Sequence, residues 1–178
     1  MPLTAPESRI ATPRLVLLPI AENDVEDYVR LCSDEAVMRF IGDGRPAAAA
    51  ATQAWVERAL AHWQTHGFGH WTVRLRGTGE FAGRCGLVVQ QLEHGSEIEL
   101  GYVFAAQHWQ RGYATEAALA VRDYAVTERG LHRLIGLIDR DNEASRRVAT
   151  KLGLRFERQV RFGKRWTVLN QMVDLYAG

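Results

Sequence analysis

Apolar and polar positions along the chain follow two periods, which together predict an α/β protein. Apolar residues that alternate with polar or small ones predict strands, at residues 14–19, 68–75, 80–90, 97–104, 133–139, 154–160 and 167–176. Apolar residues that recur every three or four positions predict helices, at residues 22–32, 35–40, 47–66 and 115–128 and again around position 145. Short glycine-containing turns join the strands between positions 68 and 104, so we expect these strands to pair antiparallel.

The strand at 97–104, the helix at 115–128 and the strand at 133–139 form a crossover unit. Gly130 follows the helix, at a place where a glycine in the left-handed conformation commonly ends one. Two strands joined in this way are parallel, and the connection is almost always right-handed. We therefore predict a mixed sheet with helices packed on it, in which only this pair needs to be parallel.

Residues 110–115 connect the first parallel strand to its helix and have the properties of an anion site. The start of a helix leaves backbone N–H groups unpaired and carries a partial positive charge. Gly112 and Ala114 are small enough for a ligand oxygen to approach the backbone, and Arg111 adds a full positive charge. A phosphate or pyrophosphate is the natural occupant. The alternative is a plain strand-to-helix turn, in which Gly112 provides only backbone freedom.

A second motif follows the second parallel strand and begins at Asn142. We expect a crevice here, because ligands of such sheets bind beyond the carboxyl ends of the parallel strands. With this motif the sequence resembles the GCN5-related N-acetyltransferases (the GNAT superfamily), and within them the Rim-type enzymes that acetylate ribosomal-protein N-termini. The resemblance covers roughly residues 10–177, and four segments carry it: Thr12–Leu17, Glu99–Tyr102, Trp109–Ala117 and the run from Asn142 through Ser145 to Gly153.

The resemblance implies a single acetyltransferase domain over residues 11–178, after a flexible tail at residues 1–10. Its fold would be a GNAT-like mixed, mostly antiparallel sheet, with a central parallel strand pair splayed into a V and helices on both faces. In this family the strand is typically irregular near Val103. Acetyl-CoA would be the cosubstrate, with no metal. The resemblance assigns its binding to nine residues: Val103, Phe104, Arg111, Gly112, Tyr113, Ala114, Thr115, Asn142 and Ser145.

Glu99 is the candidate for the catalytic base. Its side chain would face the groove if Leu100 and Tyr102 face the core, because side chains alternate along a strand. Direct acetyl transfer needs an amine that has lost its proton, and a base within reach of that proton helps. Glu97 shares the same face and is the rival. The alternative interpretation is that Glu99 is only a surface carboxylate on a half-exposed strand.

Ser145 is the candidate for the acid that protonates the departing thiolate. Many GNAT enzymes carry a tyrosine seven residues after the asparagine, but that position is Ala149 here. Rim-type enzymes instead use a serine on the same helix, and Ser145 fits that pattern. Helix capping is the alternative role for Ser145, and a simple turn is the alternative for Asn142. The backbone at Val103 and Phe104 is the candidate donor to the oxyanion.

Composition and charge restrict the class of partner. A length of 178 residues suits one domain, and a formal net charge of +1 gives no reason to expect nucleic acid. The two cysteines, Cys32 and Cys85, have no paired spacing, which favours reduced thiols over a disulfide or zinc framework. With no long apolar run and no signal pattern at the start, we expect a cytoplasmic protein without a membrane partner. A homodimer is left open.

Three functions are compatible with these features. The first is acetyl transfer to the α-amino group of a peptide or protein, which is favoured because such a group, with a pKa of about 8, loses its proton more easily than lysine, at about 10.4. The second is the same chemistry on a small amine, such as a polyamine, an amino acid or an aminoglycoside. The third is a sensor that binds acyl-CoA without turnover.

Overall fold

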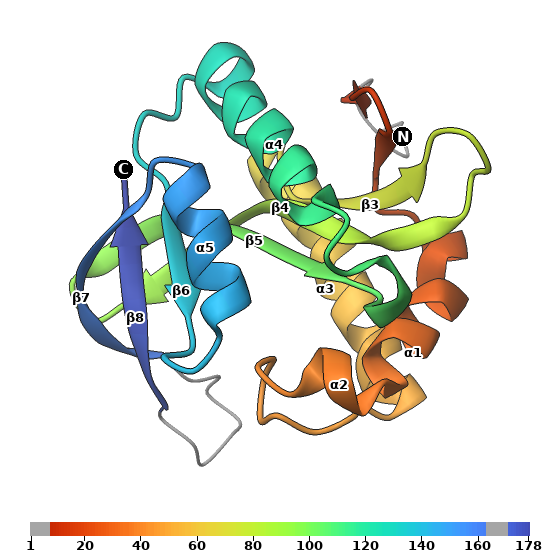
Figure 1. The fold of residues 1–178 in the computed structure, drawn as a ribbon, viewed down its shortest axis with the longest axis horizontal. Coiled ribbons are helices and arrows are strands. Elements are labelled where there is room, and N and C mark those ends of the chain that lie inside the picture. The colour runs from red at the N-terminus through yellow and green to blue at the C-terminus, as the bar shows by residue number, and fades with distance from the viewer. Residues whose placement is uncertain (1–7, 163–170) are drawn as a thin grey trace.

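The computed structural model describes residues 8–162 and 171–178 (Figure 1). Its strands are β1 (Ile10–Ala11), β2 (Leu15–Pro19), β3 (His70–Leu75), β4 (Phe81–Leu92), β5 (Gly95–Phe104), β6 (Ile135–Ile138), β7 (Arg155–Phe162) and β8 (Gln171–Ala177). Its helices are η1 (Glu22–Asp24), α1 (Val25–Ser33), α2 (Glu35–Met38), α3 (Ala49–His66), η2 (Ala106–His108), α4 (Tyr113–Arg129) and α5 (Glu143–Lys151). Each element expected from the sequence is therefore present near its expected place.

The strands form one sheet in the order β1-β2-β3-β4-β5-β6-β8-β7. Every neighbouring pair is antiparallel except β5 and β6, which are parallel. This confirms the mixed sheet in which only the pair flanking the crossover is parallel. The strand β8 lies between β6 and β7, next to the edge of the sheet.

The parallel pair meets at one position and then separates. Glu99 of β5 pairs with Ile135 of β6, and no further pair joins the two strands. Beyond Glu99, β5 continues along β4 as far as Phe104, while β6 pairs with β8 on its other side. The two strands therefore form the predicted V, with its apex at Glu99 and its open end toward the starts of α4 and α5 (Figure 1).

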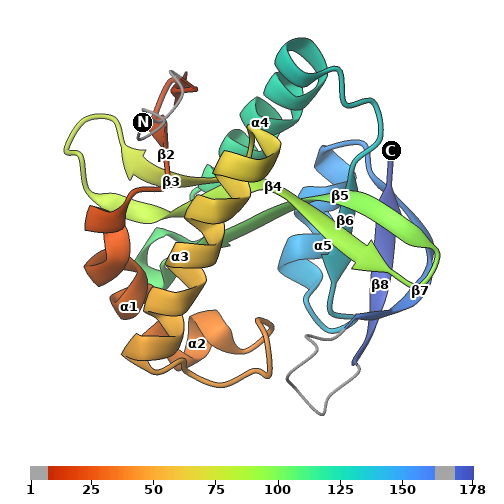
Figure 2. The same cartoon turned by 180° about the vertical axis from the view of Figure 1, so that it is seen from behind.

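Helices cover both faces of the sheet, as predicted. The helices α4 and α5 lie on one face (Figure 1), and α1, α2 and α3 lie on the other (Figure 2). The buried side of α4 consists of small or branched residues, which lets it pack closely on the sheet: Ala117, Ala118, Val121 and Ala125. Gly130 ends this helix in the left-handed conformation, with φ of 63°, as its sequence position predicted. None of the helices in the described part of the chain is both long and apolar enough to cross a membrane.

Two local features differ from expectation. The irregularity expected near Val103 is absent, because β5 pairs with β4 residue by residue from Gly95 to Phe104. A side chain at Gly83, opposite Phe104, would place its Cβ only 2.2 Å from the Val103 oxygen, so the close approach of β4 and β5 here requires glycine. Near the start of the chain, Ile10, the last residue of the segment expected to be a tail, pairs with Leu17 of β2. Residues 1–7 lie outside the described part, as do residues 163–170, which include the start of the strand expected at 167–176.

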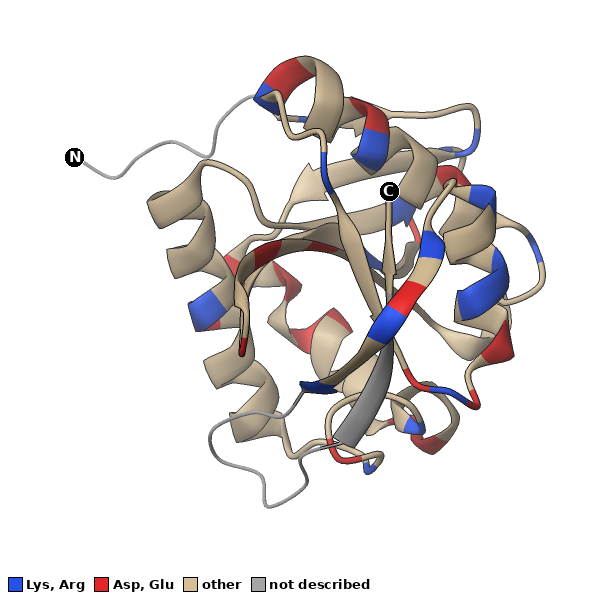
Figure 3. Ribbon diagram, turned by 90° about the vertical axis from the view of Figure 1, so that its left-hand side faces the viewer, with Lys and Arg blue, Asp and Glu red and all other residues tan. Residues whose placement is uncertain are grey.

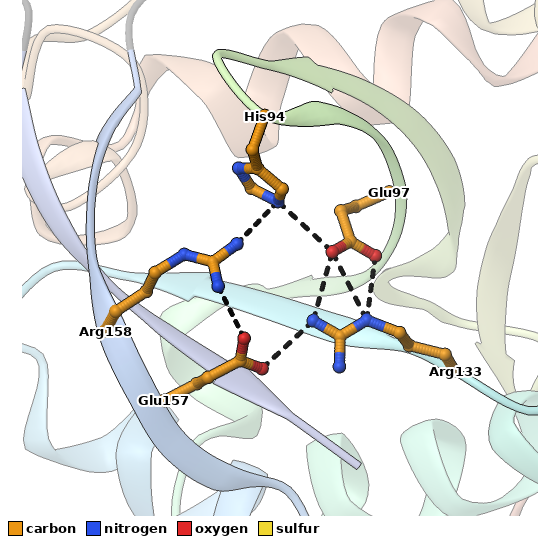
Figure 4. A network of polar contacts seen from close by, with 5 residues as sticks. All are labelled: His94, Glu97, Arg133, Glu157 and Arg158. Carbon is orange, nitrogen blue, oxygen red and sulfur yellow. Dashed lines mark hydrogen bonds and ion pairs between the residues drawn. The ribbon is translucent and has the colours of Figure 1, made fainter.

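A network of charged side chains joins the hairpin between β4 and β5 to β6 and β7 (Figure 4). Figure 3 shows bands of both charges along β7, which supplies two of its members. Arg133, just before β6, contacts the Glu97 carboxylate through Nε and Nη2, each at 3.0 Å, and reaches Glu157 at 3.0 Å. Arg158 contacts Glu157 at 2.6 Å and His94 at 2.7 Å. The network fixes the closed end of the V.

Replacing Arg133 by methionine is expected to reduce the free energy of unfolding at pH 7 by about 1 kcal/mol, the scale of a partly exposed ion pair. Hydrogen bonds from Arg133 hold the pKa of Glu97 below its ordinary value. A lowered pKa stabilises the fold above the unfolded-state pKa, and this stabilisation is lost as the pH falls through the folded-state pKa. Urea unfolding at pH 7 and pH 3 should therefore show a difference from wild type that shrinks at the lower pH.

The matched control is Arg147→Met, which removes an exposed ion pair 2.9 Å long between Arg147 and Glu143 on α5. We expect no measurable change there, because both side chains are about three-quarters exposed, at 75% and 74%. An equal loss from Arg133→Met at both pH values would instead assign the effect to packing of the arginine stem.

Candidate functional site

The loop before α4 leads into a helix start that no side-chain hydrogen bond caps among the described residues. Gly112 is the N-cap residue of α4 and has a left-handed φ of 77°, and no side chain of the described residues caps the helix there. Gln110 also has positive φ, at 60°, which is uncommon for a residue other than glycine. Tyr113, Ala114 and Thr115 form the first turn, so their backbone N–H groups precede the first intrahelical bonds. The exposed loop thus presents unpaired donors to a ligand.

The start of the chain fixes the shape of this loop. Arg14 donates from Nη1 to the backbone oxygen of Arg111 at 2.9 Å, and its Nε lies 2.6 Å from the Glu116 carboxylate. Thr12 donates to the other oxygen of Glu116 at 2.6 Å. Burial favours a higher pKa for Glu116, but the hydrogen bonds from Thr12 and Arg14 outweigh it and lower the pKa. The guanidinium of Arg14 also lies 4.7 Å from the centre of the Tyr113 ring.

Glu99 lies in the fork between β5 and β6. Its carboxylate accepts a hydrogen bond from Gln90 Nε2 at 2.5 Å and interacts with the backbone N–H of Leu137 on β6. Burial raises the pKa of Glu99 above its ordinary value, although the bond from Gln90, the charge of Arg84 and the Leu137 N–H act against the rise. A carboxylate with a raised pKa is a stronger base than an ordinary glutamate. Its position and environment therefore both suit proton transfer.

Glu97, the rival, is in a different state. Its carboxylate is bound on both oxygens by Arg133, and its pKa is lowered. A carboxylate held by a cation is a weaker base, and releasing it would break the network at the closed end of the V. The surroundings of the two carboxylates therefore favour Glu99 over Glu97 as the candidate base.

The start of α5 lies across the V from β5. Asn142 caps the helix, because its side-chain oxygen accepts the backbone N–H of Ser145 at 3.2 Å. Capping is thus the role of Asn142 and not of Ser145. The hydroxyl of Ser145 forms no hydrogen bond with another described residue, whereas its backbone oxygen accepts one from the Tyr102 hydroxyl at 2.9 Å. Val103 and Phe104 follow Tyr102 at the open end of the V.

Three further side chains belong to this site, and the local sequence gave little sign of them. Gln90 lies diagonally across the hairpin from Glu99. Their proximity depends on the register of β4 and β5, which is set by the exact length of the turn between them. Tyr102 was expected to be core, but its half-buried hydroxyl bridges β5 and α5, and burial raises its pKa. Arg14 is far from Glu116 in sequence, and no periodic pattern connects residues so widely separated.

Among residues 8–162 and 171–178, no three His, Cys, Asp or Glu side chains lie together in a way that could hold a metal ion. His62 and His66, which are four residues apart on α3, stack on each other with ring centres 4.4 Å apart. Both ring nitrogens of His62 are engaged by backbone groups, the oxygen of Phe68 and the N–H of Val89.

Comparison with known proteins agrees with this geometry. Residues 14–155 match the family model described as an acetyltransferase (GNAT) domain. The Bacillus subtilis protein YkkB is 42% identical over 110 residues, which cover 62% of this chain and 64% of that relative, just under two thirds of its length. A crystal structure of an acetyltransferase from Agrobacterium tumefaciens is 28% identical, with a TM-score of 0.77 over 96% of this chain and 93% of that chain. RimL, a ribosomal L7/L12 α-N-protein acetyltransferase solved with coenzyme A, has a TM-score of 0.78 over 96% of this chain and 97% of its own. Because RimL is only 16% identical to this chain, the comparison with it shows a shared fold and nothing more.

Proposed function

The chain belongs to the GNAT family of acetyltransferases, and we propose that it moves an acetyl group from acetyl-CoA directly to a primary amine. The favoured acceptor is the α-amino group of a peptide or protein. The observation that carries the proposal is the position of Glu99, a half-buried carboxylate with a raised pKa at the apex of the V. A general base is needed there, because the acceptor amine must lose a proton as it attacks the thioester carbonyl.

The arrangement of the remaining candidates supports this assignment. The uncapped N–H groups around Gly112 suit the pyrophosphate of acetyl-CoA, and Arg111 adds positive charge beside them. The open end of the V lies between β5 and the start of α5, and its apex is at Glu99. The backbone of Val103 and Phe104 borders this path and is the proposed donor to the oxyanion. These residues are contributed by separate segments that meet only in the folded chain.

Binding and turnover measured together test the proposal. Isothermal titration calorimetry with acetyl-CoA and with coenzyme A should show binding, and thiol release should depend on an added amine. Acceptors for the panel are peptides with free N-termini, the same peptides with blocked N-termini and an internal lysine, and small amines. Binding without acceptor-dependent thiol release would favour an acyl-CoA sensor, and preference for the small amines would favour the second function. No heat with either ligand would contradict the proposal.

The proposed acid, Ser145, can be tested against Tyr102. Ser145→Ala is expected to lower kcat on the order of 10-fold, less than loss of a nucleophile would, because a thiolate needs only weak acid help. Its melting temperature should be unchanged, since Asn142 caps the helix. Tyr102→Phe removes a hydroxyl bonded to α5 at 2.9 Å without changing shape, so it serves as the matched variant. A larger loss of kcat from Tyr102→Phe than from Ser145→Ala would move the acid role to Tyr102.

We also propose a cytoplasmic location, which suits the two unpaired cysteines, Cys32 and Cys85. Cys85 is buried, and burial raises the pKa of its thiol to about 12, so it is packed as core and not poised for attack.

Whether the chain forms a homodimer is decided by light scattering of the purified protein.

A further inference from the structure

The face of β4 and β5 that carries Glu99 has a gap in its side chains. Arg84, Gly86 and Val88 of β4 lie opposite Val103, Gly101 and Glu99 of β5. Residues opposite each other in an antiparallel pair, and residues two apart on one strand, point to the same face. Two glycines therefore face each other between the Arg84 pair and the Glu99 pair.

The space above Gly101 is open and is bordered by the proposed base. A Cβ placed on Gly101 would meet no atoms within 4 Å except those of the Glu99 carboxyl group, at 3.8 and 3.9 Å. At Gly86 the situation is the opposite, because a Cβ there would lie 2.5 Å from the Gly69 oxygen and from the Cα of His70, and 2.8 Å from Nδ1 of His70. Residues 69–70 thus cover Gly86, whereas only the Glu99 carboxyl group comes within 4 Å of such a Cβ at Gly101.

Arg84 forms the opposite end of this gap. Its guanidinium lies 4.8 Å from the centre of the Trp55 ring on α3. Nη1 lies 3.4 Å from Nδ1 of His70, which is buried and whose pKa burial holds well below its ordinary value. His70 is therefore neutral and accepts this weak hydrogen bond. Stacking on Trp55 and contact with His70 fix the direction of the guanidinium.

The charge of Arg84 has no direct counterion among the described residues, 8–162 and 171–178. Its guanidinium contacts the neutral rings of Trp55 and His70, and it influences Glu99 only through space. A guanidinium offers five N–H donors, of which one is directed at His70. A half-buried cation with unused donors is suited to a planar anion, and a carboxylate matches its geometry on two atoms.

Resting on the proposed function, we propose that Arg84 binds a carboxylate of the acceptor while the acceptor amine lies over Gly101 beside Glu99. The backbone positions of Arg84 and Glu99 are four residues apart along the strands, roughly 13 Å, and both side chains extend into the gap. The amine and the carboxylate must therefore be close together in one molecule. Two sources share this chemistry: a free amino acid, and a peptide N-terminus with an acidic side chain at its first or second position.

Two matched acceptor pairs distinguish the sources. The first is an amino acid and its amide, and the second is a C-terminally amidated peptide beginning Ala-Glu and its Ala-Gln counterpart. In wild type, kcat/KM for the acidic member of one pair should exceed that of its neutral partner at least 10-fold, mainly through KM. Arg84→Met should reduce this ratio to near 1, and Arg84→Lys should restore part of it. The control Arg58→Met, at an exposed position on α3, should leave the ratio unchanged.

A readout without turnover separates this inference from the proposed function. The side-chain Nε–H signal of Arg84 in nitrogen-15 NMR, assigned by its loss in Arg84→Lys, should shift with the acidic acceptor and stay in place with the neutral one. If wild type acetylates neither pair, the proposed function fails, and the NMR titration alone decides whether Arg84 binds carboxylates. Equal ratios in wild type and Arg84→Met, or an Nε–H signal that no acidic acceptor moves, would overturn the inference. Unchanged melting temperatures show that the variants are folded.

Discussion

Replacing Glu99 by glutamine is expected to lower kcat on the order of 10²- to 10³-fold, within the range of a positioned general base. Glutamine keeps the size of the side chain and its bond to Gln90, but it cannot accept the amine proton. The affinity for acetyl-CoA should stay at the wild-type value, because the proposed pyrophosphate site at Gly112 is separate. Stopped-time assays of thiol release and calorimetry measure the two quantities independently.

The pH dependence gives a second readout. Burial raises the pKa of Glu99, so activity in wild type should fall on the acid side at a pH above the ordinary range of a glutamate. This fall in activity on the acid side, the acid limb of the pH–rate profile, should disappear in Glu99→Gln. The ionised form of a group whose pKa is raised by folding costs stability above that pKa, so the variant should keep or raise the melting temperature at pH 7. A drop in activity with a stable fold excludes simple unfolding.

Glu97→Gln is the matched control for this prediction. It removes a carboxylate from the same face of β5, but one that is bound by Arg133. We expect Glu97→Gln to lose stability, but its activity should fall on the acid side at the same pH as in wild type. If Glu97→Gln removes the limb and Glu99→Gln does not, the base has been misassigned to Glu99.

Gly112→Val is expected to weaken acetyl-CoA binding on the order of 100-fold, about 3 kcal/mol, comparable with losing one or two hydrogen bonds to a charged group. Two effects act together. The left-handed φ of 77° disfavours a branched side chain, and the side chain would occupy the surface that the pyrophosphate is proposed to contact. Calorimetric titration with coenzyme A measures the loss directly.

The control for backbone strain lies at the other end of the same helix. Gly130 has a φ of 63°, and a Cβ there would meet nothing within 4 Å. Gly130→Val should therefore cost stability in the same way as Gly112→Val, about 1–2 kcal/mol, without changing the affinity for coenzyme A. Equal affinities in the two variants would show that the loop at Gly112 is only a turn.

Much of the fold and some of the site were predictable because their signals are local. Alternation and helical spacing placed the strands and helices, and the crossover at residues 97–139 required one parallel pair whatever the rest of the chain does. Gly112 and Gly130 follow from the conformations that end and begin helices. The candidates Glu99 and Ser145 came from short motifs in which the family resemblance is concentrated.

The state of each candidate was decided only in the folded chain. Glu97 and Glu99 are equivalent by sequence, two positions apart on one face of a strand. They differ because Arg133 reaches the first at 3.0 Å, while the second lies in the fork where β6 leaves β5. The ion pair between Arg14 and Glu116 likewise joins segments far apart along the chain.

The sequence by itself determined the order of elements, the single parallel pair and the residue types available at the site. The tertiary structure decided which carboxylate is neutralised by a cation, which polar groups are free, and where glycines leave space beside Arg84. The physical reason is the distance along the chain over which each interaction acts. Backbone preferences and side-chain periodicity act over a few neighbouring residues, whereas pKa shifts and ion pairs depend on groups that only long-range packing brings together.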